Sequence, residues 1–283
     1  MADKKVLLSV LAHPDDESFG MGGTLALYAE QGVEVHLMCA TRGEVGEVAP
    51  EYLQGYPSIA ELREAELCCA AAHLGITKVH FMDYRDSGMT GSPDNEHPQA
   101  LVAAPLDEVA KKVASKIREL KPQVVLTFDP IGGYRHPDHI HIHEATVKGF
   151  QLAGDAAFED GLPPHKPAKL FFHTMSRRFI RVAVRLIKLM RKDPSKWGKN
   201  QDIDLTTLAV EDFPVHAKIK YPKVEKRKEA ASACHASQGG GRFVSGPVAW
   251  ILRLFGGTAT DTFMQAIPEV PPERIESDLF AGT

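Results

Sequence analysis

Short apolar runs alternate with segments of helical periodicity over roughly the first 130 residues of the chain. The runs are rich in leucine and β-branched residues, as buried parallel strands are, and they span residues 5–12, 33–40, 78–83 and 122–129. Helical spacing recurs between them, at about 17–30, 59–75 and 105–121. Because strands that alternate with helices form a parallel sheet covered on both faces, we expect an α/β fold, a Rossmann-like three-layer sandwich with a mainly parallel sheet.

The pattern is less regular beyond about residue 150. A strand-like run at 169–176 precedes a basic amphipathic segment, residues 178–192, whose spacing predicts a surface helix packed by its apolar side. An oligomer contact, a lid and a membrane-surface helix are the alternatives for that segment. We expect a single domain, residues 1–283, in which a C-terminal extension of about 176–283 completes the pocket of a core of about 1–175.

The composition is that of an ordinary folded protein, with 43% hydrophobic and 25% charged residues. A net charge of -4 provides no overall basic field, so we expect no nucleic-acid partner. The apolar stretch near the N-terminus reaches an acidic cluster by Asp15, which is too soon for a signal peptide or a membrane span. We therefore expect a cytoplasmic protein with no integral membrane segment, and a homo-oligomer remains open.

The cysteines favour no cross-linked framework. Cys39, Cys68, Cys69 and Cys234 form one adjacent pair and two scattered singles, without the Cys-x-x-Cys spacing of a zinc knuckle. We expect reduced, mostly buried thiols. The ligands of any bound metal must then come from His, Asp and Glu.

Two polar motifs follow predicted strands. Residues 12–17 (AHPDDE) crowd three acidic groups and an imidazole into one turn, and residues 132–139 (GGYRHPDH) predict a polar loop that enters a helix. Because the carboxyl ends of parallel strands meet at one edge of a sheet, both motifs and the segment 83–86 should converge there. The glycines at 20–23 imitate a dinucleotide-binding loop only weakly, because they come after the acidic turn.

These residue types suit metal-assisted hydrolysis. A catalytic zinc takes three ligands from His, Asp and Glu and leaves a position for water, and two ligands from the first motif plus one from the second meet that count. Asp15 can accept the proton of the water, while His136 and Tyr134 are placed to donate to an oxyanion. A single histidine of this kind is more often structural, but two clusters at equivalent strand ends favour a site.

Together the two motifs resemble those of the LmbE-like (PIG-L) de-N-acetylase family, and its mycothiol-pathway branch in particular. The segments 41–44 (TRGE), 62–66 (LREAE) and 84–89 (YRDSGM) also look like family segments. The resemblance implies an LmbE-like fold and a small-molecule substrate, an amino-sugar conjugate.

The resemblance also implies the metal centre. His13, Asp16 and His139 match the zinc ligands of the family, and Asp15 matches its general base. Two imidazoles and one carboxylate suit Zn2+ but also suit Fe2+ or another divalent ion, so the metal in the cell stays open.

Three further residues match groups that act on the reacting amide. His136 matches the imidazole that supports the oxyanion and the leaving amine, and Asp138 would orient His136. Tyr134 matches a mobile tyrosine that assists the transition state.

Substrate contacts are implied less specifically. Arg63 and Asp86 match residues that bind the sugar or its aglycone, although Arg63 could instead pair with Glu66 on one helix face. His235 and Gln238 lie in a late segment that resembles the family and would wall the pocket, although a histidine in the last helical turn can simply interact with the helix dipole.

We therefore expect a zinc-dependent hydrolase that removes an N-acetyl group from a GlcNAc-type conjugate. One rival is a hydratase of an unsaturated carboxylic acid, since the same site could activate water for addition. Another is an amidase that acts on a larger thiol-conjugate amide. A non-catalytic binding module is the remaining alternative.

Overall fold

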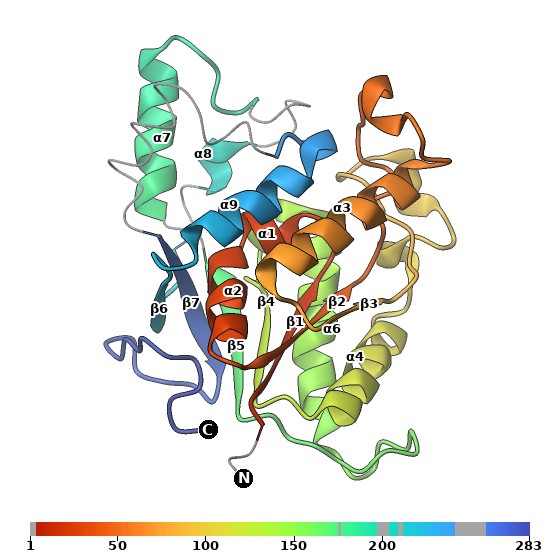
Figure 1. Cartoon of the computed structure of the whole chain (residues 1–283), viewed down its shortest axis with the longest axis vertical. Coiled ribbons are helices and arrows are strands. Elements are labelled where there is room, and N and C mark those ends of the chain that lie inside the picture. Colours follow the sequence, from red (N-terminus) through yellow and green to blue (C-terminus); the bar gives the residue numbers. More distant parts are fainter. Residues whose placement is uncertain (1–3, 175–176, 197–203, 209–211, 241–258) are drawn as a thin grey trace.

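The computed structural model, which describes residues 4–174, 177–196, 204–208, 212–240 and 259–283, is built on a seven-stranded sheet of order β3-β2-β1-β4-β5-β7-β6 (Figure 1). The strands are β1 (Val6–Leu11), β2 (Glu34–Cys39), β3 (Lys78–Phe81), β4 (Val124–Phe128), β5 (Lys169–Thr174), β6 (Ala217–Lys220) and β7 (Thr260–Ile267). Strands β1 to β5 are parallel, and β7 runs antiparallel to both β5 and β6. The predicted α/β class with a mainly parallel sheet is confirmed.

Helices cover both faces of the sheet (Figure 1). One face carries α2 (Gly22–Glu30), α3 (Ile59–Leu74) and α9 (Glu225–Cys234), and the other carries α4 (Leu106–Leu120) and α6 (Pro137–Ala153). Short helices complete the described fold: α1 (Asp16–Phe19), α5 (Gly132–Arg135), α8 (Leu205–Leu208), and the 3-10 turns η1 (Pro50–Leu53), η2 (Pro93–Glu96), η3 (Leu101–Ala103) and η4 (Ala236–Gln238).

Local sequence explains where α3 begins and ends. The Ser58 side chain accepts a hydrogen bond from the backbone N–H of Glu61, which satisfies one of the unpaired donors of the first turn. Gly75 ends the helix in the left-handed conformation, with φ of 76°, which a residue without Cβ adopts at little cost. The predicted helix 59–75 therefore agrees with α3 to within a residue.

The helix predicted at about 17–30 is wrong in one respect, because the chain breaks it into α1 and α2. Gly20 separates the two, and a Cβ on Gly20 would lie 2.7 Å from the backbone oxygen of Asp16. The chain therefore leaves the helical path immediately after the acidic turn. This break lets α1 belong to the turn that follows β1.

The segment after β5 forms a surface helix, as its spacing predicts. Helix α7 spans Arg177–Leu189, and its Ile180 and Val184 are buried in a small apolar cluster with Leu208 of α8 and Ile131. Lys188 lies on the exposed side. Beyond it in the chain, β6 and β7 join the main sheet, and the single domain stays a prediction. Of the helices that the structure describes, none is both long and apolar enough to cross a membrane.

A disulfide joins α3 to α9, so the prediction of reduced thiols is wrong for Cys69 and Cys234. Their Cα atoms lie 5.9 Å apart although 165 positions separate them in the sequence. Packing of α3 against α9 brings the two residues together, and no local spacing could have indicated it. Cys39 and Cys68 are free, the first buried and the second exposed.

The disulfide predicts a thiol count and a stability difference. Without reductant the denatured chain should show two reactive thiols, and four after reduction. Cys234→Ser should lower the free energy of unfolding by about 2–4 kcal/mol, because the cross-link restricts the unfolded chain. Cys68→Ser is the matched control, since that thiol is exposed and unbonded, and urea unfolding measures both. Four reactive thiols before reduction would contradict the disulfide.

Two histidines pair between β2 and β3 at the edge of the sheet. His36 Nδ1 lies 3.1 Å from His80 Nε2, so one ring donates and the other accepts, and the pair cannot be doubly protonated without losing this bond. Burial and the charge of Lys116 lower the pKa of His80 to about 4. Burial also lowers the pKa of His36, and the carboxylate of Glu34 opposes that shift.

This pair predicts acid sensitivity. The pKa of His80 is lower in the folded chain than the unfolded value of about 6.5, so the unfolded chain binds more protons as the pH falls from about 6.5 towards 4. The free energy of unfolding should fall between pH 7 and pH 5 in both proteins. The fall should be about 1 kcal/mol smaller in His80→Gln than in the parent chain, because glutamine is polar but does not titrate. Urea unfolding at the two pH values tests this, and an identical loss in both proteins would refute it.

Candidate active site

Three chain segments meet at the carboxyl ends of the parallel strands. The first motif follows β1, the second follows β4 as α5 and the start of α6, and the loop that carries Asp86 follows β3. The ring centroids of His13, His136 and His139 lie between 4.5 and 5.1 Å from one another. The predicted convergence of the two motifs is confirmed.

Possible ligand atoms of three side chains lie close together. His13 Nδ1 and Asp16 Oδ1 both lie close to His139 Nε2, each at 3.2 Å, and Asp16 Oδ2 lies 3.7 Å from His13 Nδ1. Atoms that share a zinc ion at about 2.0–2.2 Å are separated by roughly 3–3.5 Å, so this spacing suits a bound divalent cation. The cluster is a possible metal site. His136 joins His13 and His139 in a second possible ligand set, with ring nitrogens within 4.8 Å of one another.

The outer nitrogens of both histidines have partners that leave the inner ones free to bind a cation. His139 Nδ1 lies 3.1 Å from the backbone oxygen of Gly132, to which it donates, so its Nε2 keeps a lone pair. His13 Nε2 lies 3.1 Å from Asp138 Oδ2 and 3.5 Å from Asp86 Oδ1, so in the neutral ring Nε2 carries the hydrogen and Nδ1 keeps a lone pair. Neighbours of this kind set the tautomer and orientation of metal-binding imidazoles.

Asp138 differs from its predicted role. Its carboxylate was expected to orient His136, but Oδ2 contacts His13 and accepts the backbone N–H of Ser87 at 2.9 Å. His136 is the N-cap of α6, so its Nδ1 accepts the backbone N–H of Asp138 at 3.2 Å. Asp138 therefore holds His136 through its main chain and His13 through its side chain.

The electrostatics of the cluster require positive charge. Burial raises the pKa of Asp16, but His139 and His13 outweigh it and bring that pKa well below its usual range. Burial likewise opposes ionisation of Asp86, and His13 again lowers the pKa. For His13, burial lowers the pKa, and the nearby carboxylates, Asp86 first, raise it well above the usual value. Ionised carboxylates buried at this density favour a cation among them.

Asp15 stands beside this cluster in an unusual backbone conformation. Its φ is 123°, a region that residues with a side chain rarely adopt. Arg63 Nη2 donates to Asp15 Oδ2 at 3.0 Å. Burial raises the pKa of Asp15 to about 6, with Arg63 opposing the shift and the charge of Asp16 adding to it. A carboxylate with such a pKa can accept a proton near neutral pH.

Arg63 lies inside the molecule, with a residue exposure of 4%. Besides Asp15, its guanidinium donates to the backbone oxygens of Pro14 and Gly43. Glu66, the alternative partner that helical spacing offered, instead accepts two hydrogen bonds from Ser237, at 2.8 Å and 2.7 Å. Arg63 thus fixes the acidic turn, and its contact with a substrate stays a prediction.

Tyr134 and His136 lie on the side of the cluster formed by the second motif. The Tyr134 ring meets those of His139 and His136 edge to face, with centroids 4.9 Å and 5.9 Å apart. Burial and the charge of Asp16 raise the pKa of Tyr134 well above its usual value, so the phenol stays protonated and can donate. Burial and the charge of His13 lower the pKa of His136.

The other residues predicted to contact the substrate are buried to different extents. Asp86 is buried beside His13 and accepts the backbone N–H of Gly88 at 2.8 Å. Gln238 is half-buried in η4 and donates to Ser237 Oγ at 3.1 Å. His235 is fully buried and bonded to Glu17 at 2.7 Å, which favours a role other than the substrate contact predicted for it.

Several residues that hold the site were not singled out from the sequence as functional. Glu17 and Glu44 are within quoted motifs, and Glu44 Oε2 accepts the backbone N–H of Asp86 at 3.0 Å. Glu66 and Ser237 lie in segments that resemble the family. Their membership of those segments was the only available signal, because none of these residues carries a ligand pattern of its own.

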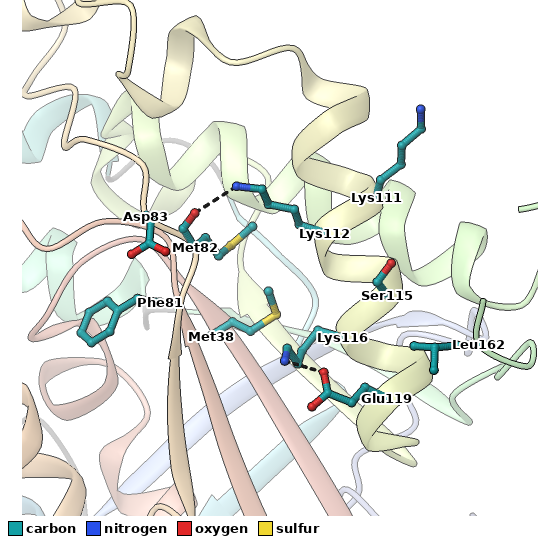
Figure 2. A pocket seen from close by; sticks show the side chains of 10 residues that line it. All are labelled: Met38, Phe81, Met82, Asp83, Lys111, Lys112, Ser115, Lys116, Glu119 and Leu162. Atoms are coloured by element: carbon teal, nitrogen blue, oxygen red, sulfur yellow. Dashed lines mark hydrogen bonds and ion pairs between the residues drawn. The ribbon is translucent and has the colours of Figure 1, made fainter. Parts of the chain in front are cut away.

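A hollow of about 500 Å³ lies away from this cluster, between α4 and the chain after β3 (Figure 2). Lysines line one side of it, but Lys112 Nζ donates to the backbone oxygen of Met82 at 3.0 Å and Lys116 pairs with Glu119. None of the predicted site residues lines this hollow. The hollow is therefore no part of the candidate site.

Comparison with known proteins gives a family match that includes both motifs. The model of the family described as GlcNAc-PI de-N-acetylase (PIG-L) matches residues 8–150. A protein of Thermomonospora curvata named 1D-myo-inositol 2-acetamido-2-deoxy-alpha-D-glucopyranoside deacetylase is 39% identical over 245 residues, which cover 83% of this chain and 81% of the relative.

Two solved structures share the fold. The N,N'-diacetylchitobiose deacetylase of Pyrococcus horikoshii superposes with a TM-score of 0.62 at 20% identity, over 93% of this chain and 84% of the other. The 4-carboxy-2-hydroxymuconate hydratase of Pseudomonas putida superposes with a TM-score of 0.59 at 20% identity, over 94% and 98%. At this identity both likenesses concern the fold alone.

The close approach of Arg63 to Gly43 predicts a costly substitution. Gly43 has φ of 68°, and a Cβ there would lie 2.0 Å from Arg63 Nη1, so Gly43→Ala adds a collision to backbone strain. We expect it to lower the free energy of unfolding by about 3 kcal/mol. Gly55→Ala is the matched control, because Gly55 has φ of 89° and no atom near its Cβ position, and strain alone should cost about 1 kcal/mol. Equal losses in urea unfolding would contradict the collision.

Proposed function

Because the chain belongs to the GlcNAc-PI de-N-acetylase (PIG-L) family, we propose that it hydrolyses the N-acetyl group of an amino-sugar conjugate, a 2-acetamido-2-deoxyglucoside joined to an inositol. The family and the N-deacetylase class predicted from the two motifs are confirmed. The inositol aglycone comes from the name of the relative and is part of the proposal.

One observation carries this proposal: a proton acceptor lies beside three converging ligand atoms. His139 Nε2 lies 3.2 Å from His13 Nδ1 and 3.2 Å from Asp16 Oδ1, Asp16 Oδ2 lies 3.7 Å from His13 Nδ1, and Asp15 is the neighbour of Asp16 in the same turn. Hydrolysis of an unactivated amide needs a polarised carbonyl, a deprotonated water and a protonated leaving amine. The site offers a group for each need.

We assign His13, Asp16 and His139 as the ligands of a divalent ion, with zinc as the first choice and ferrous iron as the second. The spacing of the ligand atoms and the excess of buried carboxylates both suit such an ion. When bound, it lowers the pKa of a water molecule towards neutrality and polarises the acetyl carbonyl.

Asp15 is the general base of the proposed reaction. Its pKa of about 6 leaves it ionised but basic enough to accept a proton from the attacking water at neutral pH. Arg63 holds one carboxylate oxygen at 3.0 Å, which directs the other oxygen. Because Asp15 precedes Asp16 in the same turn, the proposed base stays near the proposed ligands.

Tyr134 and His136 act on the amide group of the substrate in the proposed reaction. The protonated phenol of Tyr134 can donate a hydrogen bond to the carbonyl oxygen as charge develops there. His136 Nδ1 accepts the backbone N–H of Asp138, so the neutral ring carries its hydrogen on Nε2 and can donate a hydrogen bond from there, while the proton that the leaving amine takes up is the one that Asp15 accepts from the attacking water. Asp86 and Gln238 then remain as candidate contacts to the sugar.

The rival reactions are less favoured. The hydratase of Pseudomonas putida shares the fold at 20% identity, and a shared fold hosts unrelated reactions. The curated relative with 39% identity is named a deacetylase. A larger thiol-conjugate amide would need room for a bulky acyl group, which a comparison of acyl chain lengths in the assay addresses.

Replacement of the proposed base should abolish turnover without loss of metal. Asp15→Asn keeps the volume and the contact with Arg63 but cannot accept the proton, so kcat should fall about 10²–10⁴-fold. The measurement is amine release from GlcNAc-inositol and from free GlcNAc by the zinc-loaded protein, with metal analysis of both proteins. Asp107→Asn is the matched control, because that carboxylate lies on the surface and pairs only with Lys148 among the described residues.

The panel separates the candidate functions. Release from GlcNAc-inositol that needs both zinc and Asp15 would support the proposal. Full activity of Asp15→Asn would refute the role of Asp15. No release from any acetylated sugar, with metal bound at one equivalent, would overturn the deacetylase.

A further inference from the structure

A buried ion pair lies directly behind the acidic turn and has no part in the reaction proposed above. His235 Nε2 donates to Glu17 Oε1 at 2.7 Å, and both side chains have 0% exposure. The two residues come from opposite ends of the chain, 218 positions apart. The removal of two such groups from water costs free energy, so we expect a pair buried in this place to have a role of its own.

The pair reaches Asp15 through the second oxygen of Glu17. Glu17 Oε2 accepts the backbone N–H of Asp15 at 3.0 Å, while Oε1 also accepts the hydroxyl of Ser18. Asp15 needs such support, because its φ of 123° is disfavoured for a residue with a side chain. A bond to a buried carboxylate that is itself fixed can hold that conformation.

Contacts from α3 fix His235 in turn. On one side, Cys234 is bonded to Cys69 of α3. On the other side, Ser237 donates twice to Glu66, one turn after Arg63 on the same helix. Helix α9 packs across α3 and α1 (Figure 1). His235 directly follows α9 and contacts Glu17 of the acidic turn.

Arg63 and Glu17 therefore hold Asp15 at two different points. Arg63 binds the side-chain oxygen at 3.0 Å, and Glu17 binds the backbone nitrogen. The first contact sets the direction of the carboxylate, and the second fixes the orientation of the peptide group of Asp15. A base displaced by about 1 Å loses roughly a hundredfold in rate, so both constraints matter to a reaction at this site.

We propose that Glu17 and His235 are positioning residues that hold Asp15 in its working conformation, with His235 acting through Glu17. The proposal rests on the proposed function, in which Asp15 is the base. It assigns His235 to the support of the turn in place of the pocket wall.

The test compares two substitutions of His235 with opposite hydrogen-bonding ability. His235→Leu removes the donor to Glu17, and kcat should fall about 10–100-fold while KM changes by less than about twofold and one equivalent of zinc stays bound. His235→Gln restores an N–H donor at similar reach, so it should recover at least about a third of the parental kcat. His165→Leu is the matched control, because that histidine bonds to the backbone oxygen of Pro122, remote from the site, and should leave kcat unchanged.

A second readout does not depend on the substrate. The amide of Asp15 bonds to Glu17, so in His235→Leu the peptide that covers residues 13–19 should exchange hydrogen for deuterium at least about tenfold faster. Peptides from α4, on the other face of the sheet, should exchange at the parental rate. This measurement decides the positioning role even if the parent chain releases no amine from any sugar tested, an outcome that would refute only the proposed function.

Several outcomes would overturn the positioning role. Parental kcat and parental exchange in His235→Leu would show that the pair does not hold the turn. Equal loss of kcat in the Leu and Gln variants, with faster exchange throughout the chain, would show a general stabilising role. Loss of zinc at unchanged exchange in residues 13–19 would place the effect on the ligands in place of the base.

Discussion

Negative charge buried at the end of β1 is the constraint on which this structure depends. Five carboxylates, those of Asp15, Asp16, Glu17, Asp86 and Asp138, lie at or below the surface of one small region. Each has a positive or hydrogen-bonding partner there, and the imidazoles and one guanidinium supply most of them. The proposed metal ion would complete that compensation, which is why the same residues form the site and fix the surrounding loops.

Neutralisation of the buried carboxylates explains features that would otherwise only destabilise the fold. Arg63 is buried because it neutralises Asp15 and binds two backbone oxygens. Gly43 has no side chain because the guanidinium occupies the space a Cβ would need. Gly132 is similarly required, since a Cβ there would lie 2.7 Å from that of His139. Backbone strain at Asp15 persists because its neighbours determine its conformation from several directions.

The two faces of the sheet contribute different functions to the site. The second motif, on α5 and α6, supplies one proposed imidazole ligand and the proposed donors to the amide. The first motif supplies the other proposed ligands and the proposed base, and residues of α3 and of the segment after α9 hold it in place. Arg63 on α3 and His235 after α9 support the proposed base from elements other than its own. One fold can host different reactions when the residues at such a sheet edge change.

Local patterns of residues are enough to predict the elements and the residue types of the site, because the apolar runs and the two motifs are each confined to a short stretch of the chain. Strands β1 to β5 and helices α3 and α4 follow from periodicity, and the convergence of His13 and His139 follows from parallel strands ending at one edge. Four features become apparent in the three-dimensional structure alone: the break at Gly20, the addition of β6 and β7, the disulfide, and the choice of His13 as partner of the Asp138 carboxylate. These depend on which surfaces pack together across the chain, and no local pattern of residues specifies the distance between atoms that packing brings into contact.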